Sequence, residues 1–209
     1  MSRTRPPAPS TRRYARMYRL GITPWERSAP AARADVAAAL DRESAGRPTP
    51  PGRALDLGCG RGQHTPELAR RGWDVIGVDV VPRAIEAARR AHPGLRFEVG
   101  DVTDLRADAL GTFDLFLDVG CFQGLDPTQR AAEARGVTAL ARPGATVLML
   151  AFGPSRWQRL VEGASEQEIT TAFHAWDLLD VRDAETAGLG FPMNRTSPRW
   201  HRLGLRAGA

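Results

Sequence analysis

The chain has 209 residues, of which 42% are hydrophobic and 25% charged, a balance that suits one globular domain with a substantial core. It contains no apolar run near the roughly 18 residues of a membrane-spanning helix, and Met1–Arg13 shows no apolar signal-peptide core. The net charge of +5 comes from arginines dispersed along the chain, which favours a solvated surface over a nucleic-acid-binding patch.

The N-terminal region is expected to precede the first strand as a separate helical element. Residues 1–13 are rich in proline and arginine and are predicted to be a disordered tail. Tyr14–Leu20 and Ala29–Leu40 have apolar residues at helical spacing, and a turn through Pro24 separates them. We predict that residues 14–46 form a helical lid over a ligand pocket.

The rest of the chain is organised around a short strand, Ala54–Leu57, that runs into glycines 58, 60 and 62. A helix, Gln63–Arg71, is predicted to follow. Glycines allow a sharp turn and let a ligand lie against backbone N–H groups. Asp56, two residues before the first glycine, would repel a pyrophosphate and would suit a ligand that carries an ammonium group.

Acidic residues also follow the next two predicted strands. Asp74–Val78 ends at Asp79, which is placed to accept the ribose hydroxyls of an adenosine, with Val80 against the adenine. The third strand, Leu95–Val99, is followed closely by Asp101. Asp79 fits dinucleotide enzymes as well as other adenosine-binding proteins, so it indicates adenosine without separating these classes.

The second half of the chain completes an α/β fold. Predicted strands and helices alternate, and a capping box of Ser165 and Glu168 begins the last helix. The last strand follows a short connection and is expected to be antiparallel. The fold class is a Rossmann-like, doubly wound, seven-stranded sheet, within a single domain over residues 14–209. The predicted elements are Pro82–Ala91, Phe113–Leu117, Pro127–Leu140, Thr146–Leu150 after a Pro143-Gly144 turn, Ser165–His174, Trp176–Val181 and Arg199–Leu205.

The run Asp56-x-Gly58-x-Gly60-x-Gly62 resembles motif I of the class I S-adenosylmethionine-dependent methyltransferases. The resemblance implies that Asp56 holds the methionine end of S-adenosylmethionine, that Asp101 accepts the adenine amino group, and that the Val102 N–H binds a ring nitrogen. Gly21-x-Thr23-Pro24-Trp25 resembles the stretch before motif I in thiol, thiopurine and halide methyltransferases, which makes Trp25 a candidate wall of the cofactor pocket. The predicted cofactor-binding set is Trp25, Asp56, Gly58, Cys59, Gly60, Gly62, Asp79, Val80, Asp101, Val102 and Asp118.

The loop after the fourth strand is similar to the Asp-x-Gly-Cys-aromatic-His run of many small-molecule methyltransferases, but Gln123 replaces the histidine. Glutamine cannot accept a proton near neutrality. Asp118 is the alternative base, or it only fixes the cofactor, and Asp118 and Gln123 are therefore the catalytic candidates. The Asn/Asp-Pro-Pro-aromatic motif of enzymes that methylate nucleic-acid bases is absent. Acceptor-binding candidates are Tyr14, Tyr18, Cys121, Gln123 and Trp157.

These features predict a methyltransferase of small molecules, with a slight preference for a thiol or other soft nucleophile. The alternatives are an O- or N-methyltransferase of secondary metabolism and a cofactor-binding homologue without methyl transfer. A nicotinamide-dependent oxidoreductase would need its third glycine one place later. No metal-ligand spacing is present. The two cysteines agree with a reducing cytoplasm, no membrane partner is expected, and the protein is expected to be a monomer or homodimer.

Overall fold

A computed structural model describes residues 9–21, 24–154, 162–186, 189 and 193–208. They form one seven-stranded sheet with the strand order β3-β2-β1-β4-β5-β7-β6. The strands from β3 to β5 are parallel, whereas β7 runs antiparallel to both of its neighbours. This arrangement confirms the predicted fold class. The strands are β1 Arg53–Leu57, β2 Asp74–Asp79, β3 Arg96–Val99, β4 Phe113–Val119, β5 Ala141–Phe152, β6 Trp176–Asp183 and β7 Pro198–Leu205.

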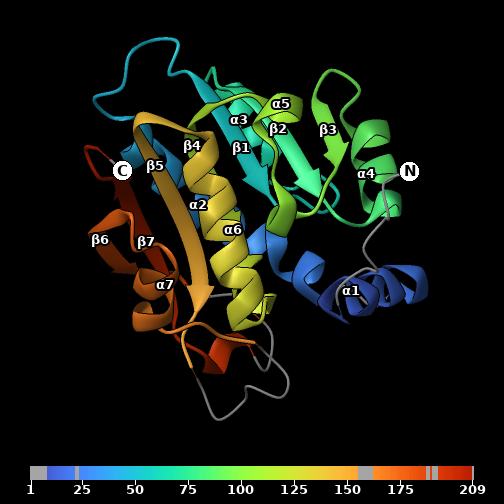
Figure 1. Ribbon diagram of the computed structural model, residues 1–209. Coiled ribbons are helices and arrows are strands. Elements are labelled where there is room, and N and C mark those ends of the chain that lie inside the picture. The colour runs from blue at the N-terminus through green and yellow to red at the C-terminus, as the bar shows by residue number, and fades with distance from the viewer. Residues whose placement is uncertain (1–8, 22–23, 155–161, 187–188, 190–192, 209) are drawn as a thin grey trace, which may run out of the picture.

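Helices cover both faces of the sheet, as Figure 1 shows. Successive side chains of a strand point to opposite faces, and β5 follows this rule: Met149 packs in the core under α6 and α7, while Leu148 packs in the core under α2 and α3. The sheet is therefore buried on both sides, which explains its continuous apolar strands. The helices are α1 Pro9–Leu20, α2 Pro24–Ser44, α3 Thr65–Arg70, α4 Pro82–Ala91, α5 Ala107–Leu110, α6 Pro127–Leu140 and α7 Glu166–Ala172. Short 3₁₀ helices are η1 Val102–Asp104, η2 Phe122–Gly124 and η3 Met193–Arg195.

The N-terminal helices are longer than predicted. Helix α1 begins at Pro9 and takes in residues 9–13, which we had predicted to belong to a disordered tail. Helix α2 begins at Pro24, inside the predicted turn, because proline is tolerated in the first turn of a helix, where its missing N–H has no partner to lose. No helix in these described ranges is both long and apolar enough to cross a membrane.

Strand β5 also begins earlier than expected. Ala141 pairs with Phe113, and the register with β4 then shifts before Thr146 pairs with Leu115. The Pro143-Gly144 pair, predicted to be a turn before the strand, lies within this irregularity, where Gly144 has a φ of 79°. The backbone therefore absorbs Pro-Gly as a bulge, a place where sheets tolerate both residues.

Candidate active site

A cavity of about 240 Å³ lies at the carboxyl ends of β1, β2 and β4. In Figure 1 the tips of β1 and β2 point towards α1. Helix α1 closes this side because Tyr18 packs with Val81 and Ala84 at the start of α4. Open α/β sheets bind ligands at this edge. The predicted residues that line the cavity are Tyr14, Tyr18, Asp56, Gly58, Cys59, Gly60, Asp79, Val80, Asp101, Val102, Cys121 and Gln123.

The glycine loop has little room for side chains. Gly58 and Gly60 have φ values of 63° and 56°, which L side chains rarely adopt. A Cβ on Gly58 would lie 2.7 Å from the Cys121 sulfur, and one on Gly60 would lie 2.8 Å from the Tyr18 hydroxyl. Gly62, predicted to contact the cofactor, does not line the cavity; a Cβ there would meet the Phe97 ring at 2.8 Å. Gly62 therefore serves the packing of the loop on β3.

Asp56 is placed for a cationic ligand group. Its side chain is buried, and the Thr65 hydroxyl donates a hydrogen bond to Oδ2 at 2.6 Å. Burial, with the nearby Asp118 and Asp79 carboxylates, raises the pKa of Asp56 to about 7. An ammonium group in the cavity would favour the ionised form of this carboxyl.

Asp79 has a second role that the sequence did not indicate. Its carboxylate accepts the Gly60 N–H at 2.9 Å and the Val81 N–H at 2.8 Å, so it fixes the glycine loop while it faces the cavity. Burial raises the pKa of Asp79 from its ordinary value. At the next strand end, Asp101 Oδ1 accepts both the N–H and the hydroxyl of Thr103. No described residue donates to Asp101 Oδ2, which leaves an acceptor free for a ligand amino group.

Asp118 does not face the cavity, so the prediction that its side chain contacts cofactor or acceptor is wrong. The carboxylate is fully buried and accepts the N–H groups of Cys121 at 2.8 Å and Phe122 at 2.9 Å. The chain reverses at Gly120, whose φ is 82°, and this turn brings both N–H groups back to the strand end. Asp118 therefore shapes the loop that carries Gln123.

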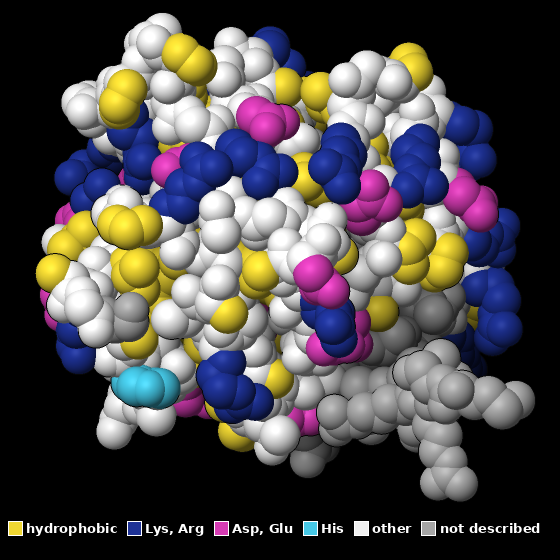
Figure 2. Space-filling model, turned by 45° about the horizontal axis from the view of Figure 1, so that its top comes forward, with side chains coloured by type: hydrophobic (Ala, Val, Ile, Leu, Met, Phe, Trp, Pro, Cys, Tyr) yellow, Lys and Arg dark blue, Asp and Glu magenta, His cyan; other side chains and the backbone are white. Residues whose placement is uncertain are grey.

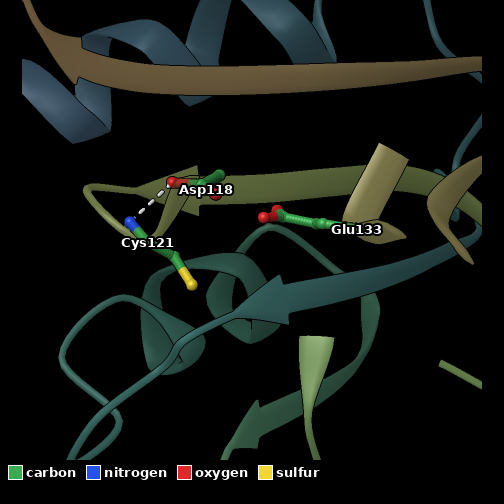
Figure 3. Close-up of side chains that lie close together, drawn as sticks. All are labelled: Asp118, Cys121 and Glu133. Carbon is green, nitrogen blue, oxygen red and sulfur yellow. Dashed lines mark hydrogen bonds between the residues drawn. The ribbon is translucent and has the colours of Figure 1, made fainter. Parts of the chain in front are cut away.

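Glu133, which the sequence analysis did not single out, lies beside Asp118. Figure 3 shows its carboxyl group extending from α6 towards Asp118 and Cys121, and one potential metal-ligand atom from each of the three residues lies within 4.8 Å of the others. Burial and the Asp118 carboxylate raise the pKa of Glu133 well above its ordinary value. Glu133 therefore binds its proton more tightly than an exposed carboxyl does. Spacing in the sequence could not indicate that Glu133 lies beside Asp118, because Glu133 is on α6 and Asp118 is on β4.

A signal for Glu133 did exist in the helical pattern. Helix α6 buries Ala134, Val137 and Leu140 against the sheet, and Arg130 and Glu133 lie on the same face at helical spacing. Charged residues on the apolar face of a helix are rarely buried without a partner. Both are buried here, Arg130 over the backbone of the 122–123 loop and Glu133 beside Asp118.

The acceptor side of the cavity is formed by the loop after β4 and the end of β5. Gln123 Oε1 accepts the Phe152 N–H at 2.7 Å. Burial raises the pKa of the Cys121 thiol well above its ordinary value, so this cysteine is not a nucleophile at neutral pH. Tyr14 lines the cavity and donates a hydrogen bond to Glu162 at 3.2 Å. The Trp25 side chain and Trp157 lie outside the described residues.

Sequence reasoning missed the far wall of the cavity. His64 faces it and is nearly buried, and burial lowers its pKa to about 4, so the imidazole is neutral at pH 7. Asp35 of α2 also faces it and accepts a hydrogen bond from the Trp200 indole. The connection from β6 to β7 contributes Ala184, Glu185, Leu189 and Met193, and Pro198 at the start of β7 adds to the same wall. Such isolated apolar residues in a loop have no periodicity to reveal them.

Comparisons with known proteins find similarity to methyltransferases. Residues 54–145 match the family model of a methyltransferase domain. A 2-heptyl-1-hydroxyquinolin-4(1H)-one methyltransferase of Mycobacteroides abscessus is 28% identical over 142 residues, which cover 64% of this chain and 62% of that protein. The chain spans less than two thirds of the length of the curated relatives it matches.

Solved structures share the fold over nearly the whole chain. The 1,6-didemethyltoxoflavin-N1-methyltransferase of Burkholderia thailandensis has a TM-score of 0.71 at 22% identity, covering 99% of this chain and 94% of that one. A structure described as converting a disulfide bond into a thioacetal group during echinomycin biosynthesis has a TM-score of 0.72 at 22% identity, covering 95% and 94%. Residues 54–145 are therefore similar in sequence to a methyltransferase domain, and the whole chain shares its fold with solved methyltransferase structures.

Proposed function

We propose that this protein transfers a methyl group from S-adenosylmethionine to a small-molecule acceptor. The observation that carries the proposal is the meeting of Asp56, Asp79 and Asp101 with the glycine loop on one cavity. Asp56 would pair with the ammonium of the methionine end, Asp79 would accept the ribose hydroxyls, and Asp101 Oδ2 would accept the adenine amino group. These three acceptors complement the donors of an adenosine that carries an amino acid.

The residues of the chain would act mainly by binding and orientation. S-adenosylmethionine supplies a methyl group already activated on a sulfonium, with a neutral leaving group. Holding nucleophile, methyl carbon and sulfur in line contributes up to roughly 7–11 kcal/mol in well-oriented systems. The glycine loop would hold S-adenosylmethionine, and the loop that carries Gln123 would border the acceptor. Tyr14 and Tyr18 of α1 would cover the cavity and exclude water.

The acceptor is proposed to be a small organic molecule, with a slight preference for a thiol or other soft nucleophile. The thioacetal-forming structural neighbour acts on sulfur, which supports this preference. The hydroxyquinolone and toxoflavin methyltransferases act on heterocycles, which supports the alternative of an O- or N-methyltransferase. All these named acceptors are small molecules.

The distribution of charge supports a small acceptor over a nucleic acid. On the face shown in Figure 2, arginine side chains are interspersed with Asp and Glu instead of forming a continuous basic patch. Ion pairs such as Arg53–Asp74, Arg89–Glu98 and Arg142–Asp114 account for part of this pattern. We further propose that the protein works in the cytoplasm as a monomer or homodimer.

Calorimetric titration with S-adenosylhomocysteine, beside NAD as a control, tests the cofactor. We expect micromolar binding of the first and no binding of the second. An acceptor screen with S-adenosylmethionine, starting with thiols, then tests transfer. Binding without transfer to any acceptor would contradict the enzymatic proposal and would favour a cofactor-binding homologue, whereas binding of NAD alone would favour an oxidoreductase.

A further inference from the structure

The amide of Gln123 is held in one orientation. The Phe152 N–H can only donate a hydrogen bond, so the atom that it meets at 2.7 Å must be the Gln123 oxygen. The NH₂ end of the same amide therefore points away from Phe152, and Nε2 lies 3.7 Å from where a Cβ would stand on Gly120. Gln123 lines the cavity, and none of the described residues accepts a hydrogen bond from Nε2. The Gln123 NH₂ group is thus a hydrogen-bond donor at the cavity that no described residue uses.

A buried cation fixes the loop behind this amide. The Arg130 guanidinium donates to the carbonyl oxygens of Phe122 at 3.2 Å, Gln123 at 3.0 Å and Gly163 at 2.9 Å. Its side chain is only 8% exposed, whereas its partner Glu168 is 47% exposed and partly screened by solvent. A positive charge behind the loop and a donor in front of it both favour an anion in the acceptor site.

The ionisable groups that the described structure places beside the 121–124 loop are poor proton acceptors. Burial raises the pKa of the Cys121 thiol well above its ordinary value, and neither Asp118 nor Glu133 lines the cavity. Glu162 does not line the cavity and already accepts the Tyr14 hydroxyl. The carboxyls of Asp35 and Glu185 and the neutral imidazole of His64 line the far wall of the same cavity, and the dependence of activity on acceptor acidity shows whether any of them acts as a base.

We propose that Gln123 donates its side-chain N–H to an anionic acceptor atom, and that the acceptor is an acidic aromatic compound: an aromatic thiol, an acidic phenol or an N-hydroxy heterocycle. The apolar residues Leu125, Leu150, Phe152, Leu189 and Met193 form the cavity wall that would receive the aromatic body. This inference rests on the proposed methyl transfer and narrows its substrate class.

The chemistry of the step is balanced without a protein base. The acceptor loses its proton to solvent before it binds. Its sulfur or oxygen anion then forms a bond to the methyl carbon as the bond from carbon to the sulfonium sulfur breaks. The electron pair of that bond stays on sulfur, and the products are the neutral methylated acceptor and S-adenosylhomocysteine.

The first test is a series of acceptors of graded acidity. Substituted thiophenols and nitrophenols would be compared at fixed pH with unsubstituted phenol, whose pKa is about 10, and with benzyl alcohol. We expect kcat/KM to fall with decreasing acidity, and its pH profile to shift with the pKa of each acceptor. A single pH profile shared by all acceptors would reveal a protein base and would overturn the proposal. Comparing kcat/KM for the thiophenols with kcat/KM for the nitrophenols shows whether a sulfur or an oxygen acceptor atom is preferred.

The second test changes the donor alone. Gln123→Glu keeps an oxygen for the Phe152 N–H but places a carboxylate where the NH₂ group stood. We expect kcat/KM to fall about 100-fold or more, as when an oxyanion donor is removed, with unchanged affinity for S-adenosylhomocysteine. Gln167→Glu on the exposed start of α7 is the matched control and should behave as wild type. Wild-type kcat/KM for Gln123→Glu would overturn this inference and leave the proposed methyl transfer intact, whereas absence of transfer by the wild type would overturn both.

Discussion

The two sides of the cavity are built in different ways. On the cofactor side, Asp56, Asp79 and Asp101 each belong to, or closely follow, one of three strands that are consecutive along the chain and adjacent in the sheet. On the acceptor side, the wall comes from α1, the loop after β4, the end of β5 and the connection from β6 to β7. The first side is local in sequence, and the second is assembled from distant segments. The cofactor is therefore readable from sequence, while the acceptor depends on tertiary structure.

The largest effect is expected on the cofactor side. Asp79→Ala would remove the acceptor for the ribose hydroxyls and weaken S-adenosylhomocysteine binding about 100-fold or more, because hydrogen bonds to a charged group contribute roughly 1.5–3 kcal/mol each. It would also leave the Gly60 and Val81 N–H groups without their acceptor, so a lower melting temperature is expected, with the fold retained. Asp74→Ala, at the exposed start of the same strand, is the control for calorimetry. Equal affinities of Asp79→Ala and wild type would refute the adenosine assignment.

A second substitution tests the contact between the two sides. A Cβ on Gly58 would press on Cys121 of the acceptor loop, whereas one on Gly46 would meet nothing within 4 Å, although both glycines have positive φ. Gly46→Ala therefore measures backbone strain alone, about 1 kcal/mol. Gly58→Ala should cost more stability in urea unfolding and should weaken S-adenosylhomocysteine binding about tenfold, since overpacking costs typically 1–3 kcal/mol. If both variants lose the same stability and bind alike, the two sides are not coupled through this contact.

The pH dependence of cofactor binding should be smaller but specific to Asp56. Its pKa in the free protein is about 7, and an ammonium group binds only the ionised carboxylate tightly. Affinity for S-adenosylhomocysteine should therefore rise with pH up to about 7, by at most about tenfold per pH unit, with one proton released on binding below that pH. Titration in two buffers of different ionisation enthalpy measures this proton. Asp56→Asn should bind more weakly with little pH dependence, and a flat wild-type profile would argue against the ammonium pairing.

The substitution with the least expected effect on cofactor affinity is at Glu133, behind the acceptor side, where stability is what changes. Its raised pKa means that the folded protein holds a proton that the unfolded chain releases, so stability falls as pH rises above the ordinary carboxyl range. Glu133→Gln keeps a polar side chain of the same size and cannot ionise, so its free energy of unfolding should decline less between pH 5 and 8, by up to about 1.4 kcal/mol per pH unit. Glu133→Leu controls for loss of the polar group. Parallel stability curves for wild type and Glu133→Gln would show that Glu133 is ionised.

How much of the structure could be predicted from the sequence also differs between the cofactor side and the acceptor side of the cavity. The seven-stranded sheet with its antiparallel last strand, the capping box at Ser165 and the meeting of Asp56, Asp79 and Asp101 at one edge were predictable because hydrophobic runs and turn residues are local signals. The side chain of Asp118 was misplaced because a tight turn at Gly120 diverts it to backbone N–H groups. Glu133 was missed because Asp118, the carboxyl that it lies beside, is on a different element, β4. The extent of α1 was underestimated because polar residues at its start carry no apolar periodicity.

The position of β7 has a consequence for the order of assembly. This strand follows β6 in the chain but lies between β5 and β6 in the sheet, where it pairs with both. During synthesis, β6 has no neighbour in the sheet until β7 has emerged, whereas β1 to β5 can already pair. The strand ends proposed to bind the nucleoside, on β1 to β3, are therefore all synthesised before Pro198 and the preceding connection, which complete the opposite wall. A nascent chain is then expected to be able to recruit its cofactor, which would stabilise the partly finished sheet, before it can discriminate between acceptors.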